Sequence, residues 1–271
     1  MKLKFLFSFI FLFSSLVSLS QNVKKIYIDE DLKEMNLVTY IAKCKYKTNK
    51  CVEYKTDSLA IYKVLKKFSF NKLSAKNYEQ IRLLLNQDSN IKIDSGETII
   101  LKNFDSIYSY SSAKKKHDNH AKTHISTLNG KPLHHNNYNK KTYERNEKTH
   151  IRNIRKCTQK FEKLNNIKVL YTFSNSELSN SKNSKLNIIK ARSIIKSTFF
   201  KILYQYDTLI LKPNGEYFLS GGHLNDKLVK KIVLTKNWTT LKNDWKDSRE
   251  KYPITGSGLF KFDKSHSKHC F

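Results

Sequence analysis

Three histidines lie close together near the middle of the chain, at the spacing H-x2-H-x3-H. They are His117, His120 and His124. Neutral imidazole nitrogens are common ligands of Zn²⁺ and Cu²⁺, and positions i, i+3 and i+7 share one face of a helix. The spacing therefore predicts a candidate metal site, with zinc or copper as its cofactor. Three lysines (Lys114, Lys115 and Lys116) precede this set and Lys122 lies within it, so the alternative is a solvated polar loop that holds no cofactor.

A second candidate site, for an anion, is the turn Gly221-Gly222-His223, which precedes an apolar helical pattern. Backbone N–H groups at the start of a helix can bind an anion. Two glycines without the rest of a phosphate-binding loop are also typical of a tight connection between a strand and a helix, where glycine supplies a positive φ angle. Both interpretations stay open.

Four cysteines follow the first forty residues: Cys44, Cys51, Cys157 and Cys270. We expect Cys44 and Cys51 to face each other across a hairpin and to form a disulfide, with two free buried thiols as the alternative. The C-x6-C spacing differs from the redox C-x-x-C pattern and from a zinc knuckle. Cys157 lies on an apolar stripe, which favours an inert core thiol, and its pairing with Cys270 stays open.

Local patterns of the common hydrolases are missing from the sequence. It contains no G-x-S-x-G, no H-E-x-x-H and no spaced Asp/Glu pair that would serve as acid and base. An enzyme is therefore less strongly indicated than a binding protein, although residues distant in sequence can still meet in space.

The first twenty residues predict a secretory signal. Lys2 and Lys4 precede the apolar run Phe5–Phe13, and small residues follow with cleavage expected near Gln21. The alternative is an uncleaved membrane anchor, for which the run is short. We expect an exported protein, periplasmic or secreted, without a transmembrane segment after cleavage.

The chain is strongly basic, with 51 Lys and Arg residues against 23 Asp and Glu and a net charge of +28. Removal of the signal takes away two lysines and leaves +26. Only six of the basic residues are Arg, the residue that forms bidentate contacts with phosphate. The charge therefore does not indicate nucleic acid as the partner. An acidic envelope polymer is the partner that this charge suggests, and a solvated basic surface is the alternative.

Residues 21–112 are predicted to form an α+β lobe. Extended segments are expected at 25–28, 38–44 and 51–54, and a β-hairpin from 97–101 and 107–110. Asp57 and Ser74 suit the N-cap positions of helices that end at Phe68 and Leu85. The apolar stripes of both helices predict a core.

The rest of the chain divides by composition. Residues 113–146 are rich in Lys, His and Asn and predict a long polar loop. Residues 147–252 predict an α/β lobe: a helix from Lys148, a strand at 167–173, a helix over 188–202, a hairpin at 207–219, a helix capped by Asn225 and a helix at 241–251. Residues 253–271 are expected to form a flexible tail.

The order helix, strand, helix, β-hairpin, helix from Lys148 onward resembles the core of thioredoxin-like proteins. That resemblance implies a mixed sheet whose central strand leads into an active-site loop. The loop after 169–173 here reads Ser174-Asn175-Ser176-Glu177 in place of C-x-x-C, and Leu203–Asp207 lacks the proline expected before the hairpin. The resemblance therefore implies a redox-inactive member, and a generic α/β sandwich is the alternative.

These observations favour an exported, non-catalytic protein that binds a ligand or supports the cell envelope. The whole chain also resembles exported bacterial proteins of unassigned function, a likeness that carries no active residues. One alternative is a thiol- or metal-dependent enzyme or accessory protein that uses the cysteines and histidines. A second alternative is a binder of an anionic polymer.

Overall fold

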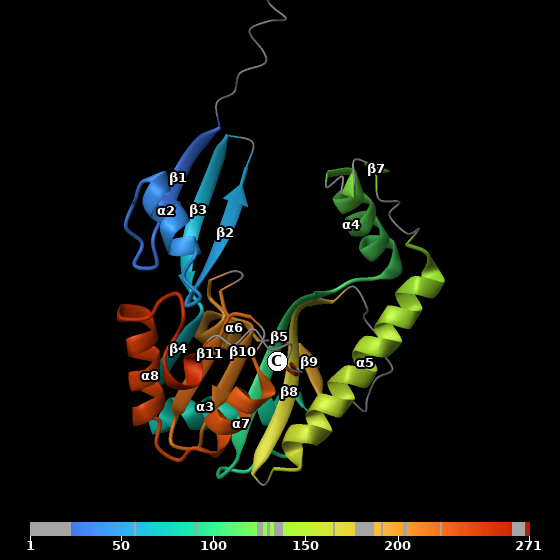
Figure 1. Ribbon diagram of the computed structural model, residues 1–271. Coiled ribbons are helices and arrows are strands. Elements are labelled where there is room, and N and C mark those ends of the chain that lie inside the picture. Colours follow the sequence, from blue (N-terminus) through green and yellow to red (C-terminus); the bar gives the residue numbers. More distant parts are fainter. Residues whose placement is uncertain are drawn as a thin grey trace, which may run out of the picture. The chain divides into compact units, whose positions relative to one another are not determined.

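The structure is a computed structural model, shown in Figure 1. It describes residues 23–261 and 269–271, apart from 57, 90, 124–126, 129–130, 133–137, 165, 177–186, 191, 203–204 and 223. The predicted signal at residues 1–20 and its cleavage site lie outside the described residues. Among the helices described, none has the length and apolar character needed to cross a bilayer.

The chain divides into two compact units between Lys66 and Lys67. The smaller unit contains β1 (Lys24–Ile28), α2 (Leu37–Cys44), β2 (Asn49–Lys55) and β3 (Leu59–Lys66). Its described strands form one sheet in the order β1-β3-β2, with β1 parallel and β2 antiparallel to β3. Tyr27, Tyr40 and Tyr62 pack their rings together between α2 and this sheet, at centroid distances of 5.1 to 5.8 Å.

Two expectations for the smaller unit are wrong. Residues 38–44 form helix α2, whose first turn is capped by Asn36 Oδ1 at 2.8 Å from the N–H of Thr39. The helix expected from Asp57 to Phe68 is also wrong: residues 59–66 form strand β3, Phe68 begins the next strand, and Asp57 lies outside the described residues. The apolar spacing of this segment fits a helical face, but β3 is paired along both edges, and those non-local hydrogen bonds prevail over the local pattern.

Cys44 and Cys51 form a disulfide with a Cα–Cα distance of 5.7 Å. The pair was expected from a hairpin, whereas the bridge joins the last residue of α2 to strand β2.

The larger unit is built on a mixed six-stranded sheet in the order β4-β11-β10-β5-β8-β9, among the residues described. Strands β5, β8 and β9 are parallel, and β10, β11 and β4 join them in antiparallel steps. The bounds of its elements are β4 (Phe68–Lys72), α3 (Ala75–Asp88), β5 (Thr98–Ile107), α4 (Tyr110–Thr123), β6 (Thr127–Leu128), β7 (Lys131–Pro132), α5 (Lys140–Glu162), β8 (Ile167–Ser176), β9 (Ile188–Lys190), α6 (Ser193–Phe199), β10 (Thr208–Leu211), β11 (Glu216–Ser220), α7 (Asp226–Leu234), α8 (Thr239–Glu250) and the 3₁₀ turn η2 (Gly258–Phe260).

A hydrophobic core lies on each face of this sheet, which gives three layers. Ile100 in β5 points into the core shared with α5, α7, α8 and η2, where Trp238 and Phe218 are fully buried. Its neighbours Ile99 and Leu101 point to the opposite face and pack with α3 and α6. Both faces of β5 are therefore buried, as expected for a central strand that is covered by helices on both sides.

Several predicted elements are present in the larger unit. Ser74 caps α3, with its Oγ accepting from the N–H of Asn77 at 3.2 Å. Asn225 caps α7 by accepting from the N–H of Lys227 at 2.8 Å. The strand at 167–173, the hairpin at 207–219 and the helix near 241–251 correspond to β8, to β10 with β11, and to α8.

Three other predictions for the larger unit are wrong, two of them because they missed non-local strand pairing. The expected hairpin at 97–101 and 107–110 is one long strand, β5, which pairs in parallel with β8. The expected polar loop at 113–146 contains α4 and the beginning of α5, which Asn139 caps at 2.9 Å from the N–H of Thr142. Residues 188–202 divide between edge strand β9 and helix α6.

The predicted domain boundaries do not coincide with the division at Lys66. Strands β4 and β5 fall within the predicted lobe at 21–112, yet they pair in one sheet with strands of the predicted lobe at 147–252. The predicted flexible tail at 253–271 is anchored at both of its described ends. Phe260 and Phe271 are buried, and Cys270 forms a disulfide with Cys157.

Candidate functional site

The carboxyl end of β5 is a place where the direction of the chain changes across the sheet. From β5 the chain crosses through α4 and α5 to β8 on one side, and later returns through α6 to β10 on the other side. In open α/β sheets, ligands bind outside the carboxyl ends of parallel strands at such a switch point. This edge is therefore where the fold favours a ligand site (Figure 1).

Midway along β5, where β10 begins to pair with it, one face of the sheet carries an ion pair and a hydroxyl group. Lys102 Nζ lies 2.9 Å from Asp207 Oδ1 and donates to Thr208 Oγ1 at 3.1 Å. Thr208 in turn donates to the Asp207 carboxylate at 2.8 Å. The Lys102 side chain is 12% exposed and that of Asp207 37% exposed, so the pair lies at the boundary between core and solvent.

The other face of the sheet at this level carries an amide and a second hydroxyl. Thr172 Oγ1 donates to Asn103 Oδ1 at 3.0 Å, and these two residues are register partners in β8 and β5. The N–H of Asn103 donates to the carbonyl oxygen of Asp207 at 2.7 Å, which ties β5 to the start of β10. The side chains of Asn103 and Thr172 are both buried.

The groups of this polar cluster satisfy one another. Thr208 and Thr172 are fully buried, so neither hydroxyl is accessible to act as a nucleophile. Across the described part of the chain, every buried side-chain N or O atom has a hydrogen-bond partner. The arrangement can hold β5, β8 and β10 together, and the Asp207 side chain is more exposed than that of Lys102. It supplies no activated nucleophile.

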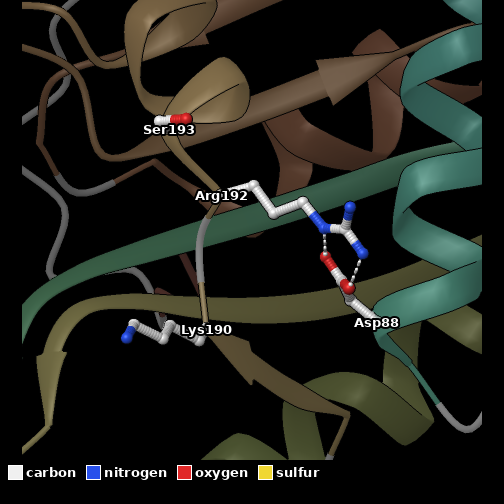
Figure 2. Close-up of a pocket in the computed structure, with 4 residues that line it drawn as sticks. All are labelled: Asp88, Lys190, Arg192 and Ser193. Carbon is white, nitrogen blue, oxygen red and sulfur yellow. Dashed lines mark hydrogen bonds and ion pairs between the residues drawn. The ribbon is translucent and has the colours of Figure 1, made fainter.

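A pocket of about 410 Å³ lies elsewhere, at the end of β9 and the start of α6, where Figure 2 shows Asp88, Lys190, Arg192 and Ser193. Arg192 makes a two-pronged ion pair with Asp88: its Nε lies 2.6 Å from Oδ2 and its Nη2 lies 2.5 Å from Oδ1. The two charges cancel, and Lys190 points away from them (Figure 2). The pocket thus offers one exposed amine and no pair of groups suited to acid–base chemistry.

The predicted histidine site is described only in part. His117 stacks on Tyr138 at a centroid distance of 4.9 Å, and its Nδ1 lies 3.4 Å from Asp118 Oδ1. His120 belongs to the same helix, α4, whereas His124 lies outside the described residues. Among the side chains that the structure describes, no group of three or more His, Cys, Asp or Glu residues is placed to hold a metal ion.

The first backbone amide of the predicted anion site is already hydrogen-bonded to another strand. The N–H of Gly221 donates to the carbonyl oxygen of Lys67 at 2.8 Å, which extends the pairing between β11 and β4. A Cβ atom at this position would lie 1.6 Å from the carbonyl oxygen of Gln205, so close packing requires glycine. Gly222 has a φ of 141°, and His223 lies outside the described residues.

The cysteines give no reactive thiol. Cys157, expected as a core thiol, is joined to Cys270 with a Cα–Cα distance of 5.4 Å, so both pairs of cysteines are disulfides. Two disulfides are consistent with an oxidising compartment.

Sequence reasoning missed a row of cations on α5. Lysines and arginines recur at intervals of three and four residues from Lys141 to Lys156. This interval would have revealed one helical face, but the expected loop at 113–146 cut the pattern in two.

Comparisons with protein-family models, with curated proteins and with solved structures gave no match.

Proposed function

We propose that this chain is an exported, non-catalytic binding protein whose larger unit is a thioredoxin-like scaffold without redox cysteines. The sheet order supports this scaffold, because β5 lies between β8 and the hairpin β10–β11, and α7 follows the hairpin. With β5 as the central strand, the loop that corresponds to an active-site loop is Tyr108-Ser109, before α4. That loop contains no cysteine, and neither does the segment after Phe173.

The observation that carries the proposal is the position of the four cysteines. Both pairs are closed, and neither lies at the carboxyl edge of β5. Thiol–disulfide exchange needs an accessible thiolate. Cys157 and Cys270 hold a helix to the C-terminal segment, which is a structural use of a disulfide.

The polar cluster where β10 meets the middle of β5 also favours binding over catalysis. Lys102, Asp207 and Thr208 are engaged with one another, and the hydroxyl is buried. A ligand that meets this cluster would find a fixed polar surface in which the positions of the donors and acceptors are already set. The net charge of +28, or +26 without the predicted signal, attracts an anionic ligand at long range more strongly than a neutral one.

The test is an assay of the natively purified protein for reduction of insulin disulfides, together with titration of free thiols in denaturant without reductant. We expect no insulin reduction and no free thiol. Steady turnover would overturn the proposal and favour the thiol-dependent alternative.

Elemental analysis of protein purified without a histidine tag tests the metal-dependent alternative. We expect zinc and copper far below one equivalent per chain. One equivalent retained through gel filtration, and lost together with an activity on chelation, would replace the proposed function with a metal-dependent one.

A further inference from the structure

One face of α5 carries six cations, which we define as the α5 cationic surface. At 100° per residue these six positions fall within an arc of about 100°, opposite the buried residues Ile154 and Phe161. All six side chains are exposed. Figure 1 shows α5 running beside β8 along one flank of the sheet. The surface consists of Lys141, Arg145, Lys148, Arg152, Arg155 and Lys156.

No ion pair joins any of these six residues to an acid within the part of the chain that the structure describes. The pairs that α5 does make lie outside the surface: Lys140 pairs with Glu144 at 4.0 Å and Lys160 pairs with Asp226. Acids three or four residues from cations on a helix form ion pairs that neutralise its surface. The α5 cationic surface instead keeps its charge for solvent or a ligand.

Arginine is concentrated on this surface. The chain has six arginines among its 51 basic residues, and three of the six, Arg145, Arg152 and Arg155, are on α5. Random placement among the basic residues would put fewer than one arginine in a set of six. A surface needed only for solubility would be served equally by lysine, which this chain uses almost everywhere else.

Two other arginines show how this chain uses the guanidinium group. Arg82 makes a two-pronged contact with the Glu79 carboxylate, with Nε–Oε2 at 3.0 Å and Nη2–Oε1 at 2.5 Å. Arg192 makes the same kind of contact with Asp88. In both cases arginine matches a planar oxyanion, as the geometry of its donors favours. The three arginines on α5 have the same donors and no carboxylate of their own.

We infer that the α5 cationic surface binds an acidic polysaccharide through its carboxylate or sulfate groups. This inference rests on the proposed binding function, because it names the class of ligand. From Arg145 to Arg155 the helix rises about 15 Å. That length presents several donors in a row, which suits a polymer with repeated anionic groups better than a single small anion.

Two other polyanions fit the surface less well. The arc contains no aromatic side chain on which an unpaired base could stack, and stacking is a main term in binding single-stranded nucleic acid. Anionic membranes are bound by helices that insert an apolar face, whereas the apolar face of α5 is buried in the core. The two disulfides are consistent with a compartment outside the cytoplasm, where acidic polysaccharides are found.

The experiment compares two variants that lose equal charge, with heparin as the sulfated probe and polygalacturonate as the carboxylated probe. The first carries R145Q, K148Q, R152Q and R155Q, and the control carries K227Q, K230Q, K231Q and K236Q on or next to α7. In 0.15 M salt we expect the α5 variant to bind at least tenfold more weakly than the native chain, and the control less than threefold. The slope of log K against log salt should fall for the α5 variant by about one for each lost contact.

A third variant separates shape from charge. R145K, R152K and R155K together keep the charge and remove the two-pronged donors, so we expect binding to weaken about three- to fivefold. Circular dichroism and thermal unfolding of each variant check that α5 is intact.

Equal weakening in the α5 and control variants would overturn the inference and would leave the proposed binding function standing. Preferential binding of double-stranded DNA or of anionic lipid vesicles by the native chain, at equal charge concentration, would overturn the choice of polysaccharide. Insulin reduction or stoichiometric metal would count against the proposed function itself and not against this surface.

Discussion

Cys157 in α5 and Cys270 near Phe271 are joined by a disulfide although 113 residues separate them. Around this bridge the N–H of Cys270 donates to Asp226 Oδ1 at 2.7 Å, and the ring of Phe271 packs on Phe161 at a centroid distance of 5.1 Å. The bridge therefore fixes the C-terminal segment against α5 and α7, on the side of the helix opposite the α5 cationic surface.

Removing this bridge should destabilise the larger unit strongly. In the chain-entropy description, a disulfide that closes a loop of this length contributes about 5 kcal/mol, and one that closes a seven-residue loop contributes about 2 kcal/mol. We expect the double variant C157S/C270S to lose more stability in urea unfolding than C44S/C51S. An equal or smaller loss would show that the C-terminal segment is held mainly by its packing.

Tyr171 gives a prediction at alkaline pH. Burial raises the pKa of Tyr171 to about 12 from an ordinary value of 10.0. Between these two pH values the folded state holds the phenolic proton more tightly than the unfolded chain does, so the free energy of unfolding falls as pH rises. At pH 12 this effect should lower the free energy of unfolding by roughly 2 to 3 kcal/mol relative to neutral pH.

The variant Y171F should lose this part of the pH dependence. At pH 7 we expect a cost of about 1 kcal/mol, since the hydroxyl contacts Thr158 Oγ1 and the carbonyl oxygen of Ile154, each at 3.4 Å. Urea unfolding at pH 7, 10 and 11.5 measures both effects. The exposed Tyr252 provides the control, because Y252F should leave the alkaline slope unchanged. If Y171F kept the alkaline fall in stability of the native chain, Tyr171 would not be its source.

Gly221 gives a packing prediction with a matched control. A Cβ at position 221 would overlap the carbonyl oxygen of Gln205, whereas a Cβ at Gly96 would meet no atom within 4 Å. We expect G221A to cost about 3 kcal/mol or more, because backbone must move, and G96A to be neutral or slightly stabilising. Thermal unfolding compares the two variants. Similar melting temperatures would show that the connection after β11 is looser than described.

Local signals explain which parts of the fold could be predicted from the sequence. Helices α3 and α7 begin at the caps Ser74 and Asn225, and the hairpin β10–β11 turns at Asn214-Gly215, so neighbouring residues specify each of these elements. Strand β8 was also predictable, because its apolar run is bounded by turn residues.

The remaining parts depend on partners that are distant in sequence. Ile61, Val64 and Leu65 have helical spacing, but the segment is a strand because β1 and β2 pair with both of its edges. The Cys157–Cys270 bridge has no local signal at all. The α5 cationic surface was missed for a different reason: its first residues were assigned to a loop, and Asn139 was not recognised as the cap of a long helix.

The most direct test of binding through α5 is arginine footprinting. The native chain is treated with phenylglyoxal, with and without saturating heparin, and the modified positions are identified by mass spectrometry. We expect heparin to protect Arg145, Arg152 and Arg155 at least fivefold, and to leave the exposed Arg249 on α8 unchanged. Protection of Arg249 equal to that of the three α5 arginines, or no protection of those three, would contradict the account.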